Sequence, residues 1–199
     1  MNFDWVLKVL RSKHPFSDEN FQRLVPLFEQ RSYAKNEFVF QPGEVVKETF
    51  FVTKGIFRHY FVTAEGKERI IYFSEEGNFA GELMSFLFEK PTDFYFQALE
   101  DAELLVLNRE NWEIAFTTIP SFSLYQLKLH AQFIYDLKQE MGNAAKITPD
   151  EKYRSLLEKN PSLASRLPQY QIATYLGITP ETLSRIRKRM QAADLDPDQ

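Results

Sequence analysis

Short apolar runs rich in Phe, Tyr, Val and Ile occupy residues 33–107, and this pattern restricts the possible folds more than any other feature of the chain. Turn sequences separate the runs: Gln41-Pro42-Gly43, Lys54-Gly55, Ala64-Glu65-Gly66 and Glu75-Glu76-Gly77-Asn78. Runs of this length between turn residues are typical of antiparallel strands. The strands are expected at 37–41, 49–53, 56–62, 67–73, 94–100 and 102–107. A closed β-roll of the jelly-roll type is predicted, because closure protects the sheet edges.

Helical patterns flank the strand-rich stretch on both sides. Residues 3–10 and 16–31 have the spacing of short amphipathic helices, and Ser17 offers the second helix a side-chain oxygen for its free backbone N–H groups. Beyond the last strand, Pro120 begins a stretch that runs to about residue 145 with a single Gly and no further Pro. One long helix is expected there.

The long helix carries more apolar residues than an ordinary surface helix. They form two stripes, Phe122, Tyr125, Leu129, Phe133 and Leu137 on one side and Leu124, Leu127, Ala131 and Ile134 on the other. One stripe is expected to cover the β-roll, and a symmetric homodimer is the natural way to bury the second. A single-sided core helix with scattered exposed apolar residues is the alternative interpretation.

A second folding unit is predicted to begin at Thr148. In Thr148-Pro149-Asp150-Glu151, Thr is a suitable N-cap, Pro fits the first helical position and Glu completes a capping box. Residues 139–148, which include Gly142-Asn143, are therefore expected to form a hinge. The predicted fold class is α+β: an N-terminal antiparallel β-roll sensor domain over 1–120, a dimerisation helix and hinge over 121–147, and a C-terminal helical domain over 148–199.

Residues 169–189 have the pattern of two helices joined by a tight turn. Apolar residues form the inner faces of the two helices: Ile172, Ala173, Leu176, Ile178, Leu183 and Ile186. Gly177 supplies the turn residue, Thr179 the cap of the second helix and Pro180 its first position. An ordinary αα-hairpin can show the same apolar spacing, but the cap, the turn glycine and a basic end favour a helix-turn-helix that reads DNA.

Charge is distributed unevenly along the chain. Between residues 166 and 190 there are five basic residues and one acid, a local charge of +4 in a chain whose net charge is −4. This polarity suits a protein that presents one basic surface to phosphate. A solvated helix face is the alternative. With the apolar residues inward, side chains suited to base edges and phosphates lie outward: Glu181, Thr182, Arg185, Lys188 and Arg189.

The helix-turn-helix stretch resembles the DNA-binding motif of the Crp/Fnr family of transcription regulators, and the order of the upstream parts is similar over nearly the whole chain. The segment Gly77-Asn78-Phe79-Ala80-Gly81-Glu82-Leu83 resembles the start of that family's phosphate cassette. The resemblance implies a cyclic-nucleotide-binding-type β-roll, a long dimerisation helix and a winged helix-turn-helix. The nine residues after Met190 are too few for a hairpin wing, so a short or absent wing is expected.

The resemblance also implies roles for single residues. Glu181 and Arg185 match base-reading positions, and Thr179 and Thr182 match phosphate-contacting ones. Pro180 stands where the best-known members have a guanine-reading Arg, so their operator sequence is not expected here. The predicted DNA-binding residues are Tyr170, Thr179, Pro180, Glu181, Thr182, Arg185, Lys188 and Arg189. The expected partners are double-stranded operator DNA, a second copy of the chain and, by resemblance, RNA polymerase.

The same resemblance argues against a cyclic nucleotide as the effector. Binders of this type carry Arg-Ser or Arg-Thr at the positions that Thr92-Asp93 occupy here, and the Arg neutralises the cyclic phosphate. A hydroxyl and a carboxylate in its place remove the main partner of the phosphate and add repulsion. A possible effector pocket comprises Gly81, Glu82, Leu83, Thr92 and Asp93, although Gly81-Glu82-Leu83 is expected mainly to maintain a turn.

Two further residue types limit the chemistry of the chain. It has no Cys, which excludes disulfides, thiolate zinc sites and iron–sulfur clusters. Its histidines, His14, His59 and His130, lie in different predicted elements without metal-ligand spacing. No cofactor, metal or enzymatic activity is therefore expected, and a cupin-type metalloenzyme, which needs clustered His and Glu ligands, is disfavoured. A β-roll module that binds a small molecule or a protein but has lost DNA binding stays open.

The chain shows no targeting or membrane-spanning pattern. Residues 1–16 mix charged side chains into the apolar positions, unlike a signal peptide. No later segment approaches the roughly 20 apolar residues that cross a bilayer. A cytoplasmic protein without a membrane partner is expected.

Overall fold

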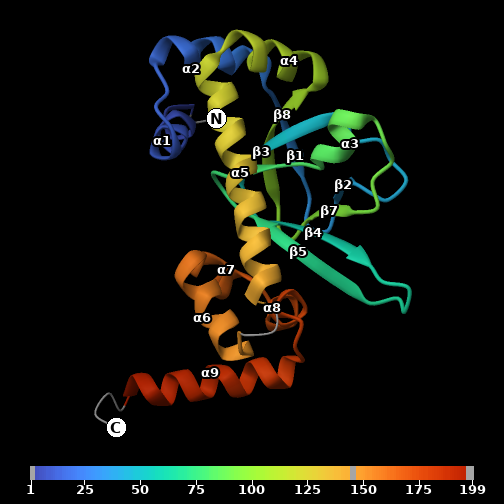
Figure 1. The fold of residues 1–199 in the computed structure, drawn as a ribbon, viewed down its shortest axis with the longest axis vertical. Coiled ribbons are helices and arrows are strands. Elements are labelled where there is room, and N and C mark those ends of the chain that lie inside the picture. Colours follow the sequence, from blue (N-terminus) through green and yellow to red (C-terminus); the bar gives the residue numbers. More distant parts are fainter. Residues whose placement is uncertain (1–2, 144–146, 196–199) are drawn as a thin grey trace. The chain divides into compact units, whose positions relative to one another are not determined.

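The computed structural model describes residues 3–143 and 147–195 (Figure 1). By the contacts between its residues, the chain divides into two compact units. The first holds the chain up to Phe61 together with Ile71–Tyr135, and the second holds Val62–Ile70 together with the chain from Asp136 onward. The domain boundaries expected near residues 120 and 147 stay a prediction.

Two four-stranded sheets form the β-roll. The first has the order β1 (Glu29–Tyr33), β8 (Ala102–Asn108), β3 (Glu48–Lys54) and β6 (Phe79–Ala80). The second has the order β2 (Phe38–Phe40), β7 (Tyr95–Ala98), β4 (Phe57–Val62) and β5 (Glu68–Ser74). The six strands predicted from the sequence are confirmed, with ends that differ by at most two residues. β1 and β6 are not predicted by the sequence pattern.

The helix predicted over 16–31 is wrong at its C-terminal end. It begins as expected, with the Ser17 side chain accepting a hydrogen bond from the Asn20 backbone N–H, but α2 spans only Asp18–Leu24. A 3-10 turn over Val25–Leu27 and then β1 follow it. Pro26 lies in that turn and has no N–H group with which to continue a helical ladder. β1 instead pairs with β8, a partner that lies far away in the sequence.

Aromatic rings fill the space between the two sheets. The ring of Phe96 in β7 lies 4.9 Å from that of Phe57, 5.4 Å from that of Phe40 and 5.9 Å from that of Phe50. All four side chains are buried. Since burying one such side chain contributes about 1.5–3 kcal/mol, this cluster is a main source of the stability of the roll.

Helices cover the other face of the first sheet (Figure 1). They are α1 (Phe3–Lys13), α2, α4 (Arg109–Thr118) and the first part of α5 (Pro120–Asn143). Successive residues of a strand point to opposite faces, so Phe50 of β3 faces the roll interior while Phe51 packs against the helices. α4 is not predicted by the sequence pattern, and neither is α3 (Leu83–Phe88).

The long helix expected after residue 120 is confirmed as α5. Phe122 and Tyr125 from its first apolar stripe are buried, whereas Leu124, Leu127 and Ile134 from its second are exposed. The hinge predicted over 139–148 is wrong for 139–143, which are helical, and 144–146 lie outside the described residues. A single Gly inside a helix costs only about 1 kcal/mol, so Gly142 does not end α5. Among the helices described, none is long and apolar enough to cross a membrane.

The second unit contains four helices after the long one: α6 (Pro149–Lys159), α7 (Pro161–Arg166), α8 (Gln169–Leu176) and α9 (Pro180–Leu195). The capping box predicted at Thr148 is confirmed, because its side chain accepts from the Glu151 N–H and the Glu151 carboxylate accepts from the Thr148 N–H. Buried apolar residues join the four helices: Tyr153, Leu156, Leu163, Leu167, Ile172, Ala173, Leu176, Leu183 and Ile186. α9 continues through Met190 to Leu195, so this described part contains no wing strand.

Candidate nucleic-acid interface

A glycine in the left-handed conformation joins α8 to α9. Gly177 has φ 70° and its N–H donates to the carbonyl groups of Ala173 and Thr174, which ends α8. The N–H of Ile178 also donates to the Ala173 carbonyl, at 3.0 Å. Because an L side chain is strained at this φ, Gly177 allows the second helix to begin three residues later.

Hydroxyl groups organise the start of α9. The Thr179 Oγ1 accepts from the Thr182 backbone N–H at 3.2 Å and lies 3.1 Å from the Thr182 hydroxyl. That hydroxyl in turn accepts a 3.2 Å hydrogen bond from Nη2 of Arg185. The Gln169 side chain donates to the carbonyl of Pro180 at 2.9 Å, which ties the first turn of α8 to the first turn of α9. This chain of contacts holds the Arg185 guanidinium toward the N-terminus of α9.

The two sides of α9 differ in character. Leu183 and Ile186 are fully buried against the other helices of the unit. The predicted DNA-binding residues lie on the outside: Tyr170, Thr179, Pro180, Glu181, Arg185, Lys188 and Arg189 are exposed, and Thr182 is half-buried. The structure thus brings the predicted residues of α9 to one accessible side of the helix-turn-helix.

Glu181 is held in its charged form. A hydrogen bond from its own backbone N–H, followed by one from the Thr179 hydroxyl, lowers the pKa of this carboxyl. At neutral pH Glu181 is therefore a carboxylate, which accepts hydrogen bonds and suits a cytosine amino group in the major groove.

Two acceptors on α6 engage cations of α9, and the sequence pattern does not reveal them. Nη2 of Arg189 donates to both carboxylate oxygens of Asp150, at 2.7 and 2.9 Å. Nε of Arg187 donates to the Tyr153 hydroxyl at 2.9 Å, and its guanidinium lies over that ring. For Lys188, no partner is found within the described residues. Lys188 is thus the cation of this helix end that is most available to phosphate.

The residues of the predicted effector pocket hold a turn and a loop of the roll. The Glu82 side chain caps α3 by accepting from the Ser85 N–H, and the Gly81 carbonyl accepts from the Tyr72 hydroxyl at 3.1 Å. Leu83 is the first residue of α3. These contacts are those of a structural turn.

The loop residues Thr92 and Asp93 offer no cation to a ligand. Thr92 is 3 % exposed, and its hydroxyl accepts from the Phe94 N–H at 3.1 Å. Its backbone makes two further hydrogen bonds, to the carbonyl of Glu44 and from the N–H of Gly43. Asp93 is exposed. The polar groups of Thr92 are therefore already used inside the protein.

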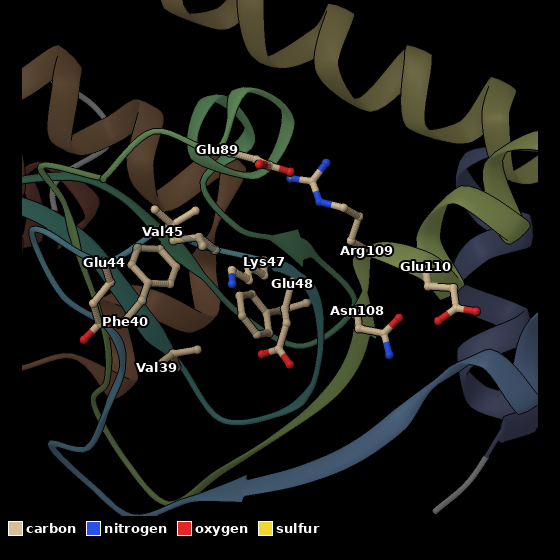
Figure 2. A pocket seen from close by; sticks show the side chains of 12 residues that line it. Val39, Phe40, Glu44, Val45, Lys47, Glu48, Glu89, Asn108, Arg109 and Glu110 are labelled. Carbon is tan, nitrogen blue, oxygen red and sulfur yellow. The ribbon is translucent and has the colours of Figure 1, made fainter.

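A pocket of about 650 Å³ lies elsewhere on the roll (Figure 2). It is lined by residues of β2, of β3 and the segment that leads into it, of the C-terminal end of α3, and of the junction between β8 and α4. None of the predicted effector residues is among them. Four carboxylates line it, from Glu44, Glu48, Glu89 and Glu110, against the cations Lys47 and Arg109. Glu48 pairs with Arg31 at 2.7 Å, and Arg109 lies 3.6 Å from Glu89. The excess of carboxylates disfavours an anionic ligand such as a cyclic nucleotide.

The histidines do not gather into a metal site. His59 is buried in the roll and neither ring nitrogen has a hydrogen-bond partner there. His14 and His130 contact Lys128 and the Gln126 carbonyl, respectively. Over residues 3–143 and 147–195, no group of three His, Cys, Asp or Glu side chains could hold a metal ion.

Known proteins with similar sequences and folds are regulators of transcription. The cyclic nucleotide-binding domain family matches residues 30–118. The transcriptional activator protein FnrA of Stutzerimonas stutzeri is 27 % identical over 175 residues, which cover 81 % of this chain and 70 % of FnrA. The cyclic AMP receptor protein of Thermus thermophilus is 24 % identical over 177 residues, 87 % of this chain and 82 % of the receptor. The structure of FixK2 from Bradyrhizobium japonicum shares the fold, with a TM-score of 0.70 at 20 % identity over 84 % of this chain and 86 % of FixK2.

Proposed function

We propose that this chain is a transcription regulator of the Crp/Fnr type, like the relatives it resembles, and that it binds a two-fold symmetric operator in double-stranded DNA as a homodimer. The outward side of α9, where Glu181 and Arg185 are exposed beside the hydroxyl groups at the helix start, carries the proposal. A recognition helix lies in the major groove with its N-terminal residues at the base edges. In a symmetric dimer two such helices meet half-sites about 10 base pairs, or roughly 34 Å, apart.

Each exposed residue of α9 has a proposed role. Arg185 reads guanine through O6 and N7, and Glu181 accepts from the amino group of cytosine. Thr179 and Thr182 contact phosphate at the front of the helix, while Lys188 contacts it behind. Tyr170 and Arg189 also lie on this surface, and Pro180 offers no cation to a base. The operator is therefore expected to differ from that of relatives with an Arg at the position of Pro180.

Replacing Arg185 by Ala is expected to lower operator affinity by about 1–3 kcal/mol and to relax the base preference at one symmetric pair of positions. Lys188→Ala is the contrasting variant. It removes a cation that binds phosphate, so it should weaken binding to all DNA sequences alike. It should also reduce the slope of log affinity against log salt concentration by about 0.9 for each phosphate that is no longer neutralised. Selection from random DNA measures the base preference. Binding isotherms between roughly 50 and 200 mM salt then measure the affinity and its salt dependence.

The same selection tests the function itself. Enrichment of a palindrome by the wild-type chain, in the presence of cell extract as a source of effector, is the expected result. If no palindrome is enriched, the chain does not read DNA, and a role as an interaction module takes its place. If the preference at every position survives Arg185→Ala, the side chain does not read a base.

We propose further that cyclic nucleotides do not regulate this chain. The relative from Thermus is named as a cyclic AMP receptor. In this chain the residues that match the phosphate-binding positions by sequence resemblance are Thr92, which is buried, and Asp93, which is exposed. A carboxylate near the cyclic phosphate repels it, and neither Thr92 nor Asp93 supplies a cation to compensate.

Titration calorimetry with cyclic AMP and cyclic GMP is expected to show no binding at micromolar concentrations, because the phosphate lacks its cationic partner. The Thermus relative serves as the positive control in the same buffer. Binding of either nucleotide with micromolar affinity would show that Thr92-Asp93 is not the phosphate-binding position.

The remaining parts of the proposal rest on the family. A cytoplasmic location, contact with RNA polymerase and the absence of a catalytic role are expected of such a regulator.

A further inference from the structure

The contact between Asp150 and Arg189 lies inside the proposed DNA-binding unit and involves one of its cations. Arg189 is 65 % exposed and Asp150 39 % exposed, measured over their side chains, so the pair is accessible to water and to a DNA backbone. Nη2 of Arg189 makes both hydrogen bonds to the carboxylate. A guanidinium has five N–H donors, so the others are not used by Asp150.

From this geometry we infer that Asp150 competes with DNA phosphate for Arg189 and so sets the sequence-independent part of the affinity. This inference rests on the proposed function, since it assumes that α9 faces DNA. Phosphate and carboxylate bind a guanidinium through the same planar arrangement of donors. A carboxylate that already occupies Arg189 cancels most of its charge, so little of that charge is left to attract an approaching phosphate.

The neighbouring cations show that this contact is selective. Arg187 is directed to Tyr153, a buried residue of α6, and is thereby removed from the DNA-facing side. Arg185 is held by Thr182 near the start of α9. Asp150 therefore acts on Arg189 and not on the base-reading residue. A change at Asp150 should alter affinity for every DNA sequence without altering which sequence is preferred.

The test compares Asp150→Asn with the wild-type full chain. Asn has the same shape and accepts a hydrogen bond, but it carries no charge, so Arg189 becomes available to phosphate. Affinity for the operator and for random duplex DNA is expected to rise by the same factor, about 3- to 10-fold at 0.1 M salt, and the salt slope should steepen by about 0.9. The ratio of the two affinities is expected to stay constant.

Two controls separate this effect from a general change of charge or fold. Glu158→Gln removes an exposed carboxylate from the same helix. It is expected to change affinity by less than twofold, because within the described residues Glu158 makes no ion pair with a cation of α9. In an Arg189→Gln background, Asp150→Asn should have no further effect. Thermal unfolding of each variant checks the fold, since the loss of a charge in the first turn of α6 costs only about 0.3–1 kcal/mol.

The outcomes are distinct. Unchanged or weaker DNA binding by a folded Asp150→Asn chain overturns the inference, and weaker binding would mean that Asp150 positions Arg189 for phosphate. A rise in affinity that persists without Arg189 also overturns it. If the wild-type chain binds neither operator nor random DNA, the proposed function fails, which is a different result from either of these.

Discussion

A chain with Leu127→Glu and Ile134→Glu is expected to be a monomer in light scattering, with a mass near 23.5 kDa instead of twice that value. Both side chains belong to the second stripe of α5 and are 64 % and 52 % exposed in the single chain. They are one heptad apart, which places them on one line along the helix. A second copy of α5 would bury them, and each carboxylate placed in such an interface costs several kcal/mol.

Loss of the dimer should also remove most of the operator affinity. A dimer binds its second half-site as an intramolecular step, which raises affinity by about 100- to 10,000-fold over one half-site. The double variant is expected to lose that factor while its helix-turn-helix stays folded, because neither side chain belongs to a buried core. Gel-shift titrations with the full operator and with a single half-site measure the difference.

A matched control distinguishes the α5 interface from a general effect of surface charge. Met84→Glu adds a carboxylate at an exposed apolar position of α3, where the side chain is 60 % exposed. It is expected to leave both the mass and the operator affinity unchanged. If the double variant of α5 still has the mass of a dimer, another surface joins the two copies.

The wild-type chain is expected to lose about 2 kcal/mol of unfolding free energy between pH 7 and pH 5 through His59 alone. The imidazole lies on β4 among aromatic rings, with ring centroids 4.7 Å away for Tyr72, 5.2 Å for Phe94 and 5.7 Å for Phe40. It is 4 % exposed, and neither of its nitrogens has a partner. Burial lowers the pKa of His59 to about 4, because the charged ring cannot be solvated there.

The direction of this pH dependence follows from proton binding. In the unfolded chain a histidine binds a proton below about pH 6.5, whereas the folded chain does not protonate His59 until about pH 4. Protons therefore stabilise the unfolded state in this range, and stability falls as the pH is lowered. Tyr72 does not titrate here, because burial and the charge of Glu82 raise its pKa.

Two variants isolate the contribution of His59. His59→Phe and His59→Gln replace the imidazole by an apolar ring and by a neutral amide, so their absolute stabilities will differ. Urea denaturation at pH 7 and pH 5 measures how much unfolding free energy each chain loses over this range. Both variants should lose the same amount, about 2 kcal/mol less than the wild-type chain loses. Equal losses in all three chains would mean that His59 is protonated as readily in the folded state as in the unfolded state.

Elements with local signals were determined by the sequence alone. Gly177 and Thr179 fix the turn and the start of α9 through contacts within a few residues, and the same is true of Thr148 at the start of α6. The six predicted strands also depend on patterns of a few residues between turns. The direction of the α9 side chains followed from the apolar spacing, because a helix has a regular period.

Features that depend on distant residues were decided only by the tertiary structure. β1 exists because β8 offers it a pairing partner, although the helical pattern of the sequence runs past Pro26 to residue 31. His59 lacks a hydrogen-bond partner because aromatic rings from other strands surround it. Asp150 meets Arg189 across 39 positions of the chain. The physical reason is the same in each case: side-chain and backbone interactions act over a few ångströms, and only folding brings these groups within that range.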